Sequence, residues 1–146
     1  MPPHSPVAPV EFYRFAPGPA LRRPLLLVRV AAGFPSAAED YIDRPLDLNK
    51  RLVANPPATY FLRVAGESMA PTIPDGALLV VDCSRQPWPG CVVVAAVHGE
   101  LTIKRFQRRD GRPVLVPDNP GYPVIELPET DGAVWGVVTA VINERP

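Results

Sequence analysis

Short apolar runs separated by turn residues fill the chain from about residue 59 onward. The runs that predict strands lie at 60–64, 77–82, 91–97, 100–106, 113–116, 123–127 and 134–142. Clusters of proline, glycine, aspartate and asparagine divide them, and the gap at His98-Gly99 predicts a tight hairpin. The run 92–97 is apolar throughout rather than alternating, which predicts a central strand covered on both faces. Because little helix is predicted among these strands, the pattern favours a mostly β, compact, multi-stranded fold.

The first part of the chain follows a different pattern. Residues 1–24 contain seven prolines and predict an irregular arm, because proline lacks the backbone N–H and fixes φ. The apolar run 25–32 is expected to be extended. Further on, Ser36 and Glu39 have capping-box spacing for a helical turn, and Asp47 is placed to cap a second short helix through Val53. The sequence therefore predicts an N-terminal arm over residues 1–56 and a β-rich domain over residues 57–146.

Composition and charge narrow the classes of function. The chain has 15 Lys and Arg residues and 15 Asp and Glu residues, so its net charge is zero. This balance does not support direct binding of nucleic acid, which normally needs a basic surface, and any contact with DNA is expected to be indirect. The two cysteines, Cys83 and Cys91, have no metal-ligand spacing with His4 and His98. We therefore expect no metal and no cofactor.

One segment imitates a secretory signal, because Arg22-Arg23 precedes an apolar run. Arg29 interrupts that run after five residues, whereas a signal needs about 7–15. No segment approaches the roughly 18 apolar residues of a membrane span. The expectation is a cytoplasmic protein without membrane attachment.

Ser68 and Lys104 are the residues with candidate chemistry. Ser68 follows the strand run 60–64, and Lys104 lies within the run 100–106. A serine hydroxyl is a poor nucleophile unless a neighbouring base removes its proton. Alternation along a strand places Thr102, Lys104 and Phe106 on one face. The pair alone is a weak signal, because most strand lysines are solvated and most serines after Gly-Glu stand in turns.

Neither histidine is well placed to be the base. His4 lies in the arm and His98 lies in a turn. Lysine can replace histidine if its pKa, ordinarily about 10.4, is lowered by burial. The apolar neighbours of Lys104 in its strand make such burial plausible, so Lys104 is the candidate base for Ser68.

Several ordered motifs resemble the LexA/UmuD family of self-cleaving peptidases. Residues 60–82 resemble the nucleophile segment of that family, residues 100–106 its lysine strand, and residues 134–138 its closing strand. Upstream, residues 33–41 and Asp47-Leu48-Asn49 resemble the UmuD branch, so that the resemblance runs from about residue 24 to 142.

The chain departs from the family pattern at two places. The bond aligned with the cleavage site is Ala32-Gly33, as in LexA, where UmuD proteins commonly have Cys-Gly. Both are pairs of small residues. The loop after Ser68 is one residue shorter than usual, which a surface loop tolerates.

The resemblance implies a serine peptidase, a hydrolase that cuts its own chain once. Ser68 would be the nucleophile, Lys104 the general base, and Ala32-Gly33 the bond that is cut. Backbone N–H groups of Glu67 and Ser68 would hold the oxyanion. The resemblance also implies a homodimer, stimulation by a RecA–single-stranded-DNA filament, and a role in SOS mutagenesis. There the shortened chain joins a UmuC-like Y-family polymerase for translesion DNA synthesis.

Three alternatives stay open. A LexA-like repressor needs a DNA-binding domain before its cleavage site, which 32 proline-rich residues are not expected to supply. A signal peptidase also uses serine and lysine, but should carry a membrane anchor. A non-catalytic β interaction module would keep Ser68 and Lys104 apart, so the distance between these side chains tests that alternative.

Overall fold

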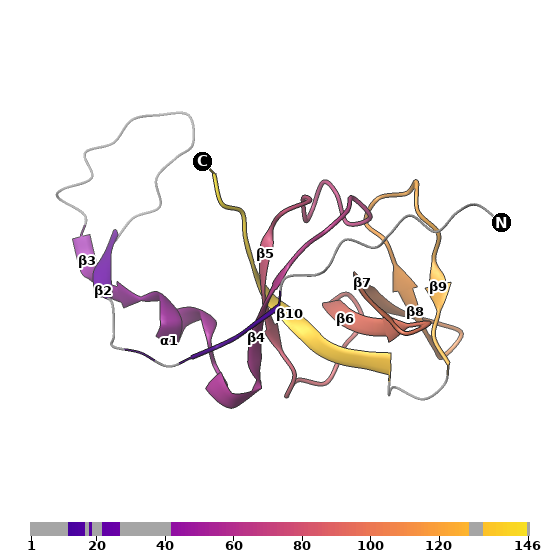
Figure 1. Ribbon diagram of the computed structural model, residues 1–146, viewed down its shortest axis with the longest axis horizontal. Coiled ribbons are helices and arrows are strands. Elements are labelled where there is room, and N and C mark those ends of the chain that lie inside the picture. The colour runs from indigo at the N-terminus through magenta and orange to yellow at the C-terminus, as the bar shows by residue number, and fades with distance from the viewer. Residues whose placement is uncertain (1–11, 17, 19–21, 27–41, 129–132, 146) are drawn as a thin grey trace. The chain divides into compact units, whose positions relative to one another are not determined.

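The computed structural model describes residues 12–16, 18, 22–26, 42–128 and 133–145 (Figure 1). They fall into two units. One contains the chain between Ala16 and Ala54, and the other contains the first strand together with the chain from Asn55 onward. The second unit carries both residues with candidate chemistry.

The larger unit is built on one eight-stranded sheet in the order β1-β4-β5-β10-β6-β7-β8-β9 (Figure 1). Every neighbouring pair is antiparallel. A 3-10 turn at Pro56–Ala58 leads into β4. The bounds are β1 Phe12–Arg14, β4 Thr59–Arg63, β5 Leu78–Asp82, β6 Val92–Val97, β7 Glu100–Arg109, β8 Arg112–Val116, β9 Ile125–Glu126 and β10 Val134–Ile142. The prediction of a mostly β, multi-stranded fold is confirmed.

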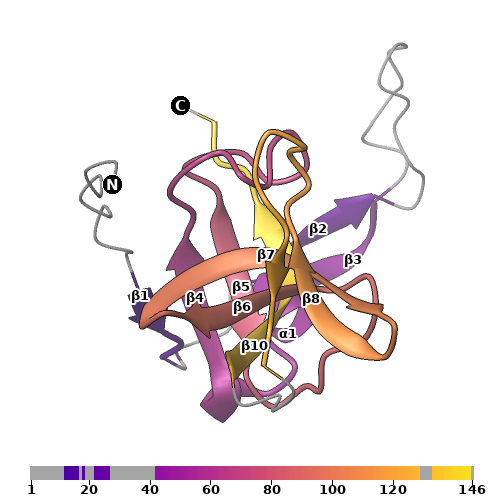
Figure 2. The ribbon, with the colours of Figure 1, turned by 90° about the vertical axis from the view of Figure 1, so that its right-hand side faces the viewer.

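The sheet curls, and this curl creates the site. Three strands separate β4 from β7 in the sheet order, yet the end of β4 and the start of β7 line the same pocket. Figure 2 shows β6 and β7 running across the direction of β4 and β5. Twist accumulates along an antiparallel sheet, so strands distant in its order can face each other.

Two apolar clusters fill the two faces of the sheet around β6. Val94 belongs to the cluster that contains Leu62, Met69 and Leu79, whereas Val93 belongs to the cluster around Phe106. Successive side chains of one strand point to opposite faces. The apolar run is therefore covered on both faces over Val93, Val94 and Ala95, as its sequence predicts, whereas Ala96 near its end is exposed.

The smaller unit is a two-stranded ribbon followed by a short helix. β2 (Arg22–Leu26) pairs antiparallel with β3 (Ile42–Asp47). α1 (Leu48–Leu52) begins after Asp47, whose carboxylate accepts a hydrogen bond from the backbone N–H of Asn49 at 3.0 Å. The predicted cap at Asp47 is confirmed. Neither α1 nor any other helix in the described part has the length and hydropathy needed to span a bilayer.

The prediction of an irregular arm over residues 1–24 is wrong where β1 and the start of β2 lie. β1 pairs with β4, and the backbone N–H of Phe15 donates to the carbonyl of Thr59 at 3.3 Å. Aromatic residues favour strands, and β1 is a proline-free stretch at the edge of the sheet. The helical turn predicted at Ser36 and Glu39 lies outside the described residues.

Replacing Gly136 with alanine is expected to destabilise the larger unit. A Cβ on Gly136 would lie 2.7 Å from Cγ1 of Val81 and 3.2 Å from Sγ of Cys83. Val81 is fully buried and has little room to move, so we expect Gly136→Ala to lower the unfolding free energy by about 1–3 kcal/mol. Denaturant unfolding measures this change. Gly18→Ala is the control, because its Cβ would meet no atom of the described residues within 4 Å beyond its chain neighbours, and equal stability of both variants would contradict the prediction.

Candidate active site

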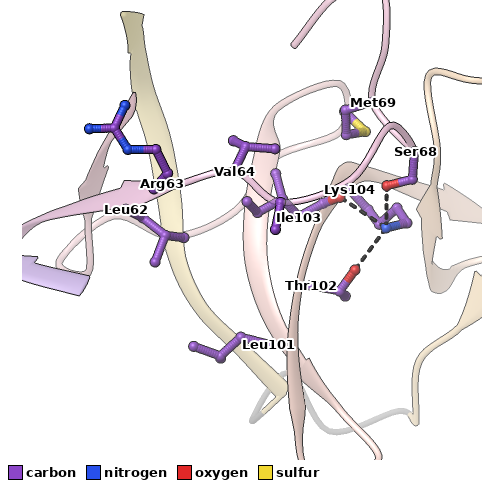
Figure 3. Close-up of a pocket in the computed structure, with 10 residues that line it drawn as sticks. Leu62, Arg63, Val64, Ser68, Met69, Leu101, Thr102, Ile103 and Lys104 are labelled. Atoms are coloured by element: carbon purple, nitrogen blue, oxygen red, sulfur yellow. Dashed lines mark hydrogen bonds between the residues drawn. The ribbon is translucent and has the colours of Figure 1, made fainter. Parts of the chain in front are cut away.

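Ser68 and Lys104 meet in the folded chain. Ser68 stands in the turn that follows β4, and Lys104 lies in the middle of β7. Nζ of Lys104 lies 2.8 Å from Oγ of Ser68, within hydrogen-bonding distance (Figure 3). The alternative in which these two side chains stay apart is therefore contradicted.

The amine of Lys104 has three partners. Besides Ser68, it donates to Oγ1 of Thr102 at 2.7 Å and to the carbonyl of Ile103 at 3.1 Å. A neutral amine has two N–H bonds and one lone pair. The two N–H bonds can serve Thr102 and Ile103, which leaves the lone pair for the proton of Ser68. Thr102 and Lys104 lie on the same face of β7, as strand alternation predicts.

Burial lowers the pKa of Lys104. The residue is only 8% exposed, and removal from water disfavours the charged ammonium form. No described carboxylate forms an ion pair with Lys104 that would restore the charge. The fraction of neutral amine near neutral pH is therefore larger than for an exposed lysine, and this neutral form is the one that can accept a proton.

A small pocket opens beside the Ser68–Lys104 contact. Leu62 and Val64 form one apolar wall, and Leu101 and Ile103 form the other (Figure 3). Ser68 Oγ, Thr102 Oγ1 and Lys104 Nζ are polar groups that meet there. The pocket can accept a small apolar side chain of an extended peptide next to the hydroxyl of Ser68.

Two neighbours of Ser68 fix the shape of the turn. Gly66 has φ +96°, a left-handed conformation that favours glycine, and its N–H donates to Oδ1 of Asp75 at 2.8 Å. Met69 is buried in the core at 1% exposure. Because Met69 is anchored in the core, the half-buried Ser68 is held at the border between core and pocket.

A polar loop that the sequence pattern does not single out contacts the turn of Ser68. The β8–β9 connection was predicted only as a turn. In the structure Asp118 accepts two hydrogen bonds from Arg105, at 2.9 Å and 2.7 Å, and its backbone N–H lies 3.4 Å from Sδ of Met69. The only available signal was the pair of polar residues Asp118-Asn119 among prolines and glycine, which fits any exposed turn.

Asp118 is expected to stabilise the fold only above acidic pH. Hydrogen bonds from Arg105 lower the pKa of Asp118, although burial opposes them. A lowered carboxylate pKa contributes stability above the unfolded-state pKa of about 4, and this contribution disappears as pH falls through the folded-state pKa. Asp118→Asn should cost about 1–2 kcal/mol at pH 7 and clearly less at pH 3. Urea unfolding at both pH values tests this, and a cost that does not depend on pH would contradict it.

The other predicted site residues lie elsewhere. Ala32 and Gly33 lie outside the described residues, so the structure does not place the predicted cleavage bond. His98 is exposed in the β6–β7 turn and does not line the pocket of Ser68. Cys83 and Cys91 are free thiols, and the described part of the chain holds no group of three or more His, Cys, Asp or Glu side chains that could bind a metal ion.

The serine beside a buried lysine in a curled β sheet is an arrangement that can serve a serine peptidase. Residues 24–139 match the peptidase S24-like family, and the chain belongs to this family. The matched range agrees with the resemblance predicted over about residues 24–142. Membership identifies the protein as a peptidase by class.

Three relatives show which members of the family the chain is similar to. The chain is 45% identical over 126 residues to protein MucA of Salmonella typhimurium, covering 84% of this chain and 86% of MucA. It is 45% identical over 124 residues to protein ImpA of Salmonella typhimurium, covering 83% of each. It is 37% identical over 123 residues to the LexA repressor of Bordetella pertussis, covering 83% of this chain and 56% of the repressor.

Proposed function

We propose that the protein is a self-cleaving serine peptidase of the SOS response. In this proposal Ser68 is the nucleophile, Lys104 is the general base, and Ala32-Gly33 is the bond that is cut. The single observation that carries the proposal is the 2.8 Å contact between Lys104 Nζ and Ser68 Oγ, at a lysine that burial holds at a lowered pKa.

The reaction has two halves. Neutral Lys104 takes the proton from Ser68 as its Oγ attacks the carbonyl carbon of Ala32. The oxyanion that forms accepts hydrogen bonds from the backbone N–H groups of Glu67 and Ser68. Lys104 then gives its proton to the amine of Gly33, which leaves. Water, activated by the again neutral Lys104, releases the acyl group from Ser68.

The pocket supports this choice of bond. The pocket is small and lined in part by apolar side chains, which suits small residues, and Ala31-Ala32-Gly33 is a run of small residues. A segment without bulky side chains can lie flat against the edge of β7 and bring its carbonyl carbon to Ser68. Cleavage would leave residues 33–146 as the shortened chain.

We further propose a UmuD-type role for the shortened chain. The chain is 45% identical to MucA and 37% identical to the LexA repressor, which favours a UmuD-type role over repression. In that role the protein is a cytoplasmic homodimer, a RecA–single-stranded-DNA filament stimulates its cleavage, and residues 33–146 join a UmuC-like Y-family polymerase for translesion synthesis. The net charge of zero supports contact with DNA through partners.

Incubation with RecA filaments tests the proposed role. Purified protein at neutral pH is incubated with RecA, single-stranded DNA and ATP, and the products are separated by mass. We expect two fragments to accumulate faster than with RecA lacking DNA. An intact chain with filaments, combined with cleavage at pH 10 without them, would support the peptidase but contradict the SOS trigger. Sequence-specific DNA binding by the intact chain would favour a repressor.

Thr102 is expected to support Lys104 through its hydroxyl. Thr102→Val keeps the shape of the side chain but removes the oxygen that accepts from Nζ at 2.7 Å. The amine then loses one of the partners that orient its lone pair toward Ser68, and self-cleavage should slow about tenfold, the effect of roughly 1.4 kcal/mol. The fraction of cut chain over time at pH 9 measures this. Thr102→Ser keeps the hydroxyl and should stay near the wild-type rate; equal rates for Val and wild type would contradict the role.

A further inference from the structure

Asn119 joins the β8–β9 connection to the nucleophile turn through two hydrogen bonds. Its side-chain Nδ2 donates to the carbonyl of Glu67 at 3.0 Å, and its backbone N–H donates to the carbonyl of Ser68 at 3.0 Å. These two carbonyls belong to the peptide units immediately before and after the Cα of Ser68. One residue, 51 positions further along the chain from Ser68, therefore binds the backbone on both sides of the nucleophile. At the Glu67 carbonyl it adds to a turn hydrogen bond that the backbone N–H of Ala70 donates at 3.1 Å.

Because the peptide bond is planar, the hydrogen bond to the Glu67 carbonyl also sets the direction of the Ser68 N–H. In a trans peptide the C=O and N–H groups point in opposite directions. The carbonyl of Glu67 faces Asn119, so the N–H of Ser68, in the same peptide unit, points away from Asn119. That N–H donates to none of the described residues. An oxyanion hole requires backbone N–H groups of this kind, fixed in direction before the charge develops.

Asn119 is itself held in place. Its Oδ1 accepts a hydrogen bond from the backbone N–H of Gly121 at 3.0 Å, which leaves Nδ2 as the end of the amide that faces Glu67. The preceding residue, Asp118, accepts hydrogen bonds from two of the three guanidinium nitrogens of Arg105, Nε and Nη2. Arg105 directly follows Lys104 in β7. The strand that carries the base therefore also holds the loop that orients the backbone of the nucleophile.

We propose that Asn119 is a positioning residue that presets the oxyanion hole by fixing the peptide unit between Glu67 and Ser68. The inference rests on the proposed role of Ser68 as nucleophile. Asn119 does not line the pocket beside Ser68. It acts through the direction of the Ser68 N–H, and so lowers the barrier of acylation without changing the protonation of Lys104.

The test is the pH profile of self-cleavage in full-length Asn119→Ala. This variant keeps the backbone N–H that binds Ser68 but loses the side-chain donor to Glu67. The maximal rate should fall about 10–100-fold, somewhat less than the loss of a direct oxyanion donor. The midpoint of the profile should stay at the wild-type pH, because the partners of Lys104 are unchanged. Asn143→Ala, at an exposed asparagine distant in sequence, is the matched control and should keep both values.

A purely structural role gives a different result. If loss of the side chain loosened the turn and let water reach Lys104, the midpoint would move toward the ordinary lysine pKa. A shifted midpoint, or an unchanged maximal rate, would overturn the inference.

Modification of Ser68 by a fluorophosphonate separates failure of this inference from failure of the proposed function. The reagent forms a tetrahedral oxyanion-like adduct on the serine and does not need the Ala32-Gly33 bond. Intact mass measures its rate of addition. We expect Asn119→Ala to react about 10–100-fold more slowly than the wild type even if the chain proves to cut a different bond. Equal reaction of the two proteins would overturn the inference, whereas slow reaction of the variant with no self-cleavage in the wild type would overturn only the cleavage assignment.

Discussion

Ser68→Ala is expected to abolish self-cleavage, with a loss of at least about a thousandfold in rate. The hydroxyl of Ser68 lies 2.8 Å from the buried amine in the described pocket, where it can lose its proton to that amine and attack a carbonyl carbon. Lys104→Met, which keeps the length of the side chain but has no base, should give a similar loss. Because both residues act on one proton transfer, the double variant should be no slower than either single variant. The fraction of cut chain after prolonged incubation at pH 10 measures all three.

Ser84→Ala is the matched control for the nucleophile. Ser84 hydrogen bonds to Asp82 and does not line the pocket, so its loss should leave cleavage intact. If Ser68→Ala still cut itself while remaining folded, another nucleophile would have to exist. Additive losses in the double variant would show that Ser68 and Lys104 act in separate steps.

Self-cleavage should accelerate about tenfold for each unit of pH below the pKa of Lys104 and then level off. The active form of the base is the neutral amine, so the rate follows the deprotonated fraction. Since burial lowers this pKa from its ordinary value of 10.5, the plateau should begin below pH 10.5. Rates measured between pH 6 and pH 11 give the profile.

Lys104→Arg is the sharpest variant for the pH dependence. Arginine keeps a positive charge throughout this range and cannot serve as the base. The variant should remain inactive at every pH. A rate that rises with pH in Lys104→Arg, or a wild-type rate that falls as pH rises, would assign the titration to another group.

Much of the fold follows from local patterns. Seven strands from residue 59 onward were predicted near their observed positions, because apolar runs and turn residues mark them directly. The observed β7 extends three residues beyond the predicted 100–106, since Gln107, Arg108 and Arg109 are polar residues that pair with β8 at the end of a hairpin. The predicted end depended on hydrophobicity, whereas pairing of the backbone continues without it.

The missed elements depend on pairing over long distances. β1 has three residues, and only its partner β4 makes it a strand. β3 contains Arg44 and Pro45 and has no apolar pattern, yet it pairs with β2. Propensity over three to six residues cannot identify such strands, because their stability comes from tertiary pairing.

The candidate site also contains some features that local sequence predicts and others that depend on long-range contacts. Ser68 and Lys104 could be named from residue chemistry and from the family resemblance, and the shared face of Thr102 and Lys104 follows from strand alternation. The contact of Asn119 with Glu67 could not be predicted in this way. It depends on the curl of the sheet, which brings the β8–β9 connection next to the turn that carries Ser68. Asn119 binds backbone carbonyl groups, which every residue has, so the residue types at these positions do not indicate the contact.

The central claim is that Ser68, activated by Lys104, cuts the bond between Ala32 and Gly33. The most direct test is the intact-mass spectrum of the purified chain after incubation at pH 10, beside Ser68→Ala treated in the same way. We predict two new masses, those of residues 1–32 and 33–146, in the wild type and none in the variant. A chain that stays intact, fragments that end at another bond, or the same fragments from Ser68→Ala would contradict the claim.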